Sequence, residues 1–335
     1  MSGSPTVRFR RRTPLVGIMM ALVLAIASLL GILLGDAVID PGAILFGELS
    51  TVDRYIVYEL RLPRVYWGII VGYAFGLAGT LFQNVTRNPL GSPDVLGVIA
   101  GSTTGALIAI TIVGTSSAGV GLFALAGAAI TAGLLVVAQF WLKASLMSVI
   151  IAGVGVTLFL NAINSWLLLR ASEEIAYSAG RWLIGTLEYA SWDRAPTGLV
   201  ATALLSVALT FTVRWYQLLG FNTDQNRIIG ASPAAMSGVL LSLGIAFTGL
   251  GVWAVGPMAL LPFAAPQIAR IAARTPTPPF FLSGLTGSIV LVIADLVARK
   301  MLGASALPVG TVVLIIGGVL LLWLTTFRPQ SMGRV

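Results

Sequence analysis

The chain has 335 residues, of which 57% are hydrophobic and only 10% are charged, and its formal net charge is +8. A soluble protein carries roughly 25% charged residues, so this composition excludes a water-soluble fold and makes lipid the solvent. Cysteine and histidine are both absent, which excludes disulfides, thiol catalysis and the usual zinc sites. The basic balance is better explained by the charge bias of membrane loops than by a nucleic-acid surface.

Apolar runs of about 20 residues, the length that crosses ~30 Å of hydrocarbon, follow one another along the chain. The first, 15–34, comes after four arginines and has no cleavage site behind it, so we expect an uncleaved helix rather than a signal peptide. Further runs predict spans at 65–85, 95–113, 118–142, 147–169, 195–213, 233–255, 280–298 and 304–327. A shorter run at 257–272, broken by Pro262 and Pro266, predicts a tenth.

Charge gives the expected orientation. With the N-terminus in the cytoplasm and ten crossings, the inside is strongly basic and the outside weakly acidic. We therefore expect one transmembrane domain over 1–335 in a bacterial plasma membrane, with both termini cytoplasmic. Residues 1–14 would be a cytoplasmic tail and 214–232 a cytoplasmic loop, whereas the amphipathic stretch 170–194 would lie at the outer interface.

Small residues recur at helical spacing in two of these runs. Such stripes let helix backbones approach closely, and we favour this packing role over a direct role in a pore. The glycines concerned are Gly68, Gly72, Gly76 and Gly79, followed by Gly97, Gly101 and Gly105.

Ion-coupling chemistry is nearly absent from the spans. Asp295 is the one acid inside an apolar run, and it stands four residues before Arg299. That spacing puts both side chains on one helix face, which favours an ion pair over a proton relay. The sequence has no P-loop motif and no catalytic triad, so the chain is not expected to be an enzyme or to hydrolyse ATP by itself.

Two amides mark the 147–169 run. Asn161 and Asn164 stand three residues apart and so share a helix face. Buried amides in membranes bond to neighbouring helices or face water. Both readings, interhelical bonding and lining of a translocation path, stay open.

Several stretches resemble the FecCD-type permeases, which import iron-siderophores, haem and vitamin B12. RLPR at 61–64 matches that family's motif, and RNPLGSPDVLGV at 87–98 resembles its RNPLADPDLLGV. APQIAR at 265–270 is similar to its APHIAR, with Gln267 in place of histidine. ADLVAR at 294–299 and LPVG at 307–310 complete the series in the family's order.

The resemblance implies an all-α polytopic fold like that of the vitamin B12 importer (a type II ABC importer), in which helices two to five and seven to ten form an inverted repeat. It further implies a pair of permease subunits, identical or paralogous, with two cytoplasmic ATPase subunits and an external substrate-binding protein. ATP and Mg²⁺ would bind those ATPases, and this chain would hold no cofactor. The expected cargo is a ferric siderophore; haem and cobalamin are the alternatives.

The resemblance also suggests roles for individual residues. The segment 220–230, GFNTDQNRIIG, stands where the family's coupling segment lies, so Asp224, Arg227 and Gly230 are candidates for ATPase coupling, although Asn226 replaces an alanine. The binding protein would dock on three arginines at outer helix ends, Arg61, Arg64 and Arg299, for which Glu59 and Asp295 are alternative internal partners.

A structural turn is expected between the second and third spans. Asn88 and Pro89 would end one helix and turn the chain. Pro93 and Asp94 would start the next, with Asp94 capping its free N–H groups.

Two other functional classes compete with the importer. A secondary transporter would need a coupling charge, and loss of uptake on removal of a separate ATPase would argue against it. A membrane enzyme or a structural scaffold is the second alternative. The lack of paired carboxylates or a metal set disfavours the enzyme, and reconstituted transport with and without the partner subunits would test the scaffold.

Overall fold

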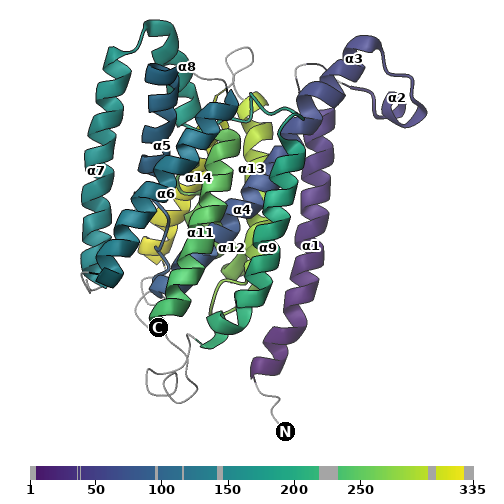
Figure 1. Ribbon diagram of the computed structural model, residues 1–335. Coiled ribbons are helices and arrows are strands. Elements are labelled where there is room, and N and C mark those ends of the chain that lie inside the picture. The colour runs from purple at the N-terminus through teal and green to yellow at the C-terminus, as the bar shows by residue number, and fades with distance from the viewer. Residues whose placement is uncertain are drawn as a thin grey trace.

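The computed structural model describes residues 5–35, 37, 39–94, 97–114, 117–141, 146–218, 233–300 and 307–327. All regular structure in these ranges is helical, as expected (Figure 1). The elements in chain order are α1 (Pro5–Leu33), α2 (Pro41–Phe46), α3 (Thr51–Tyr55), the π-helix η1 (Ile56–Arg61), α4 (Leu62–Thr86), α5 (Val98–Ile108), the π-helix η2 (Ala109–Val113), α6 (Ser117–Trp141), α7 (Leu146–Arg170), α8 (Glu173–Leu183), α9 (Ala195–Leu218), α11 (Pro233–Val255), α12 (Leu261–Ala273), α13 (Phe280–Lys300) and α14 (Val309–Phe327).

Each of the ten predicted spans coincides with one helix or one α–π pair. Within the described ranges, seven helices are long and apolar enough to cross a membrane, and 98–113 and 119–135 are shorter apolar helices. The tenth, α12, has only 13 residues. It follows a non-helical stretch in which Gly256 and Leu260 have positive φ. A broken span of this kind is tolerated where protein rather than lipid surrounds it, and most of α12 is buried.

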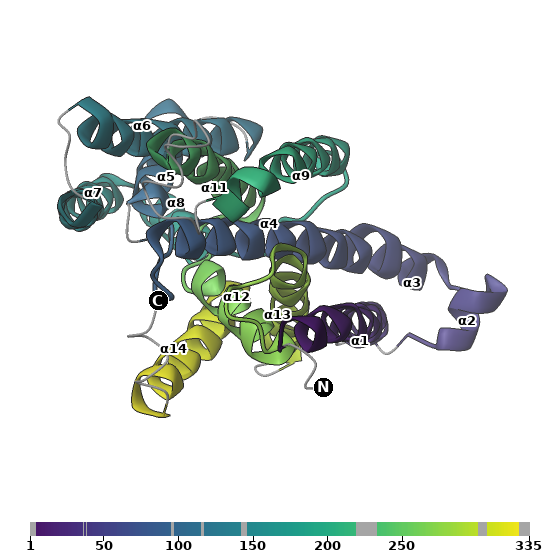
Figure 2. The same ribbon diagram turned by 90° about the horizontal axis from the view of Figure 1, so that it is seen from below.

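Helix α4 runs through the centre of the molecule. In Figure 2, α5, α6, α7, α9 and α11 lie on one side of it, and α1, α12, α13 and α14 lie on the other. Of the most apolar part of the α3–α4 segment, 78% is buried, against 11% for α1. Helix α4 is therefore the core of the bundle, whereas α1 faces lipid along most of its length.

The glycine stripe of α4 brings it against α13. A Cβ on Gly72 would overlap the backbone of Gly287, and one on Gly76 would overlap the carbonyl of Ser283. In the same way, a Cβ on Gly105 would overlap the carbonyl of Phe123 in α6. The backbones are thus in direct contact, and the packing interpretation of these stripes is confirmed.

One end of the bundle carries the longer connections. The amphipathic stretch contains α8, which Ser172 caps by accepting a hydrogen bond from the Ile175 N–H. After α8, the Thr186 N–H donates to the Val255 carbonyl at 2.9 Å and the Gly310 N–H donates to the Gly185 carbonyl at 3.1 Å. These bonds join the segment after α8 to the end of α11 and to the start of α14.

The connection between α1 and α4 holds helices that the hydropathy pattern did not predict. Helices α3, η1 and α4 form one continuous stretch, Thr51–Thr86, of 36 residues. Helix α2 precedes this stretch, and α2 and α3 project sideways past α1 (Figures 1 and 2). We call residues 39–61 the α2–α3 arm. Helix α1 begins and α14 ends at the opposite end of the bundle (Figure 1).

Candidate functional site

The predicted turn after α4 is built from short-range hydrogen bonds. Helix α4 ends at Arg87, whose φ of 50° is left-handed. The Asn88 side-chain oxygen accepts from the Leu90 N–H at 2.9 Å, and the Gly91 N–H donates to the Asn88 carbonyl at 2.9 Å. Asparagine side chains favour such turns, so Asn88 and Pro89 reverse the chain here.

Asp94 has a different role from the one predicted. Helix α5 begins at Val98 and its N-cap is Gly97, so the expectation that Pro93 and Asp94 start this helix is wrong. The Asp94 carboxylate instead accepts from the Ser92 hydroxyl at 3.1 Å and from the Leu260 N–H at 3.4 Å. It therefore ties the turn after α4 to the start of α12.

The environment of Asp94 disfavours its charged form. Burial raises the pKa of this carboxyl from 3.8 to about 6, and the hydrogen bonds from the Leu260 N–H and the Ser92 hydroxyl offset part of that rise.

A second connection joins the same two segments. The Gln267 amide donates to the Gln83 side-chain oxygen at 2.5 Å and to the Pro89 carbonyl at 3.0 Å. The Gln83 amide in turn donates to the Phe263 carbonyl at 3.1 Å. Both glutamines are buried. The residue that departs from the family pattern, Gln267, thus bonds α12 both to α4 and to the turn that follows α4.

Gln83 was not identified from the sequence. The feature that could have indicated it is a polar amide in the last turn of a glycine-rich apolar helix, shortly before the RNPL segment. That position becomes informative only when α12 is known to lie beside it.

The predicted docking arginines are mostly engaged within the chain. Arg61 is only 5% exposed. Its guanidinium donates to the carbonyls of Ile32 at 2.8 Å, Leu33 at 3.0 Å and Ala37 at 2.5 Å. Arg61 therefore lies within the fold rather than on an exposed rim, and a docking role for it stays a prediction. Its charge is placed at the carbonyl end of α1, where cations are favourable.

Arg299 also lies at the carbonyl end of α1. It forms an ion pair with Asp295 at 3.0 Å, with both side chains largely buried, so the predicted pairing is confirmed. It also donates to the Gly31 carbonyl of α1 at 3.1 Å. Arg64, like Arg299, is half-buried, and a docking role for both stays a prediction.

The two amides of α7 do not behave alike. Asn164 is buried, and its side-chain oxygen accepts from the Thr104 hydroxyl of α5 at 2.7 Å. Asn161 is exposed. The pair is therefore split: Asn164 makes the interhelical bond, and Asn161 faces away from the bundle and stays a candidate for the translocation path. The coupling candidates Asp224, Arg227 and Gly230 lie outside the described residues.

Comparison with known proteins gives consistent matches over nearly the whole chain. The model of the FecCD transport family matches residues 22–327. The ferric enterobactin transport system permease protein FepG of Escherichia coli (strain K12) is 31% identical over 93% of this chain and 96% of its own. The Fe(3+)-citrate import system permease protein YfmE of Bacillus subtilis (strain 168) is 27% identical over 97% and 99%.

Solved structures agree on the fold. An inward-facing conformation of a metal-chelate type ABC transporter superposes with a TM-score of 0.81 at 23% identity, covering 93% of this chain and 99% of that one. From the family match and the relatives together, the chain belongs to the FecCD transport family.

Proposed function

We propose that this chain is the membrane-spanning permease subunit of an ATP-driven importer and that it carries a ferric siderophore. The observation that carries the proposal is the family match over residues 22–327. It is supported by relatives named for ferric enterobactin and for Fe(3+)-citrate. Haem or cobalamin in the same pathway is the alternative cargo.

The whole chain would act as one permease domain beside a second permease subunit, identical or paralogous. ATP and Mg²⁺ would bind two separate ATPase subunits, because this sequence has no P-loop. An external binding protein would deliver the cargo. Both chain ends would be cytoplasmic, an arrangement supported by the placement of the start of α1 and the end of α14 at one end of the bundle.

Within that assembly, individual residues of this chain would have separate roles. The segment around Asp224, Arg227 and Gly230 would receive the ATPase, and Asn161 would line the path between the permease subunits. Arg64 would contact the binding protein, where a charge at the rim of an interface steers association more than it adds affinity. Nucleotide binding would shift the inward-facing and outward-facing populations.

Reconstitution tests the proposal. Proteoliposomes containing this chain, its ATPase and a second permease subunit should accumulate ferric siderophore only with internal ATP and external binding protein. Parallel uptake assays with haem and cobalamin would identify the cargo. Uptake that follows a proton or sodium gradient without the ATPase would overturn the importer assignment in favour of a secondary transporter.

A further inference from the structure

The α2–α3 arm exposes an unusual share of apolar and aromatic surface. Phe46 in α2 is 80% exposed and Val52 in α3 is 67% exposed. Tyr55, Tyr58 and Leu60 are also exposed. Exposed apolar groups gathered on one short segment mark a contact surface rather than a solvated loop.

The arm lies beside lipid. Figure 2 shows it extending past α1, away from the rest of the bundle. The outer face of α1 is an exposed apolar surface formed by Leu15, Ile18, Met19, Leu22, Ile26 and Leu29. That face must meet hydrocarbon. The arm begins shortly after α1 ends, so it lies next to the lipid that surrounds α1.

Exposed aromatic residues indicate the level of the membrane surface at this end. Trp166, Tyr177, Tyr189 and Trp192 are exposed on or near α7 and α8. The Trp192 ring N–H donates to the Tyr58 carbonyl at 2.7 Å, which holds the arm at the same level. Tryptophan and tyrosine collect at headgroup depth.

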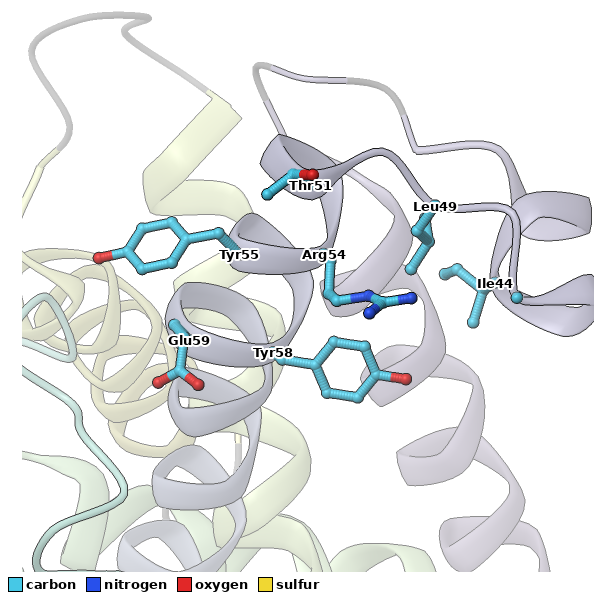
Figure 3. A pocket seen from close by; sticks show the side chains of 8 residues that line it. Ile44, Leu49, Thr51, Arg54, Tyr55, Tyr58 and Glu59 are labelled. Atoms are coloured by element: carbon cyan, nitrogen blue, oxygen red, sulfur yellow. The ribbon is translucent and has the colours of Figure 1, made fainter.

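The arm encloses an open pocket of about 630 Å³ between α2 and the α3–η1 helix. Its lining is Ile44, Gly47, Leu49, Thr51, Arg54, Tyr55, Tyr58 and Glu59. Figure 3 shows the Arg54 guanidinium above the Tyr58 ring on the side of Leu49 and Ile44, whereas Glu59 and Tyr55 lie on the other side of the helix in this view. Within the described part of the chain, neither Arg54 nor Glu59 forms an ion pair.

From this arrangement we infer that the arm rests on the lipid headgroups and that its pocket binds a zwitterionic phospholipid bearing a phosphate and a primary ammonium. The Arg54 guanidinium matches the phosphate in charge and in hydrogen-bond geometry. The Glu59 carboxylate accepts from the ammonium. Ile44 and Leu49 offer apolar contact for the carbons next to the headgroup.

The charge of the arm selects this headgroup class. Its acids are Asp40, Glu48, Asp53 and Glu59, and its bases are Arg54 and the buried Arg61. The exposed balance is acidic, so a headgroup with net negative charge is repelled. A zwitterion is not, because its ammonium meets the excess carboxylates. The inference is independent of the cargo and of the ATPase.

Lipid retention is the first test. The full chain is reconstituted into nanodiscs containing equal phosphatidylethanolamine and phosphatidylglycerol, released gently, and its bound lipids are counted by native mass spectrometry. Arg54→Gln and Glu59→Gln should each lower retained phosphatidylethanolamine roughly threefold, as expected for exposed charge pairs. The matched control is Lys300→Gln, an exposed cation at the same end of the bundle, which should retain the wild-type amount.

Depth is the second test. The chain has no cysteine, so a single fluorophore can be placed by Phe46→Cys, with Leu22→Cys in the middle of the exposed apolar face of α1 as the reference. Headgroup-proximal quenchers on lipid should quench position 46 strongly and position 22 weakly. Unchanged lipid retention in both charge variants would overturn the inference, as would a water-exposed position 46. So would a loss of binding-protein docking in Arg54→Gln with normal lipid retention, because the surface would then belong to a protein partner.

Discussion

Arg61 shows how backbone carbonyl groups stabilise a basic residue at an outer helix end. Its guanidinium donates to the carbonyls of Ile32 and Leu33 at the end of α1 and to the carbonyl of Ala37 after it, 24 to 29 residues away in sequence. The two carbonyls of α1 are among the groups that a helix end leaves without intrahelical partners. The sequence identified the charge as unusual, but the partner depends on how α1 packs against η1, which no local pattern encodes.

Arg61→Ala should destabilise the protein by about 3 kcal/mol, because it removes charge-assisted hydrogen bonds and leaves buried carbonyls unpaired. Arg61→Lys should recover only part of the loss, since an ammonium lacks the planar fork. Thermal unfolding in detergent measures both, with the exposed Lys300→Ala as the control. A stability equal to wild type in Arg61→Ala would mean that these bonds contribute nothing.

Asp94 predicts a pH dependence. Its folded-state pKa of about 6 lies above the ordinary 3.8, so the folded state binds this proton more tightly than the unfolded state does. The resulting stabilisation is complete below about pH 4 and is lost as the pH rises through 6. Asp94→Asn is neutral throughout and should lack this change. Between about pH 5 and pH 7.5 the free energy of unfolding should fall by on the order of 1 kcal/mol more in the wild type than in Asp94→Asn, because pH 5 already lies between the unfolded and folded pKa values.

Unfolding midpoints at about pH 5 and about pH 7.5 measure this effect. Glu174→Gln, an exposed carboxyl on α8, should keep the wild-type pH profile. If Asp94→Asn also keeps it, the carboxyl is not the titrating group.

At the scale of elements, the contact between α4 and α13 depends on residues without side chains. Gly76 lies so close to the Ser283 carbonyl that one added methyl group overlaps it. Gly76→Ala should therefore cost about 2 kcal/mol through overpacking. Gly133→Ala is the matched control, because nothing lies within 4 Å of its added Cβ, and it should be neutral or slightly stabilising. Equal unfolding temperatures of the two variants would contradict this account of the interface.

The spans could be predicted because each needs about 20 apolar residues whatever its neighbours are. Helix α12 was predicted only as a short, broken segment, and its 13 residues agree with that. The α2–α3 arm was missed, because residues such as Asp53, Arg54 and Glu59 interrupt the hydropathy signal although they do not prevent a helix. At the candidate site, the sequence motifs could be recognised in advance. The contacts between them could not, because a pair such as Gln83 and Gln267 is 184 positions apart and meets only in the tertiary fold.

At the scale of the whole molecule, the proposed path makes different predictions for the two amides of α7. Asn161→Cys should react with charged, water-soluble thiol reagents in at least one nucleotide state of the assembled transporter. Asn164→Cys should be protected in all states, because Asn164 is buried against Thr104. Leu204→Cys on the exposed apolar face of α9 is the control, since lipid should exclude the reagent there. Protection of position 161 in every state would remove α7 from the path.

The ATPase interface can be tested through the cytoplasmic loop. Replacing Asp224 and Arg227 together by alanine should weaken ATPase association about fivefold, the effect expected for exposed charge pairs. Co-purification and transporter-stimulated ATP hydrolysis measure it. Lys143→Ala, in another cytoplasmic loop of the expected topology, should leave both unchanged. Normal association of the double variant would place the coupling surface elsewhere.

The continuous helix Thr51–Thr86 has a mechanical consequence. Its 36 residues span about 54 Å at 1.5 Å per residue, so one rod joins the α2–α3 arm to the turn at Asn88. A rigid tilt of about 10° around its midpoint would move its two ends about 5 Å in opposite directions. Displacement on one side of the membrane would thereby reach the other through backbone hydrogen bonds alone. An apolar midplane is no obstacle to such a signal, because neither a proton nor an ion has to cross it.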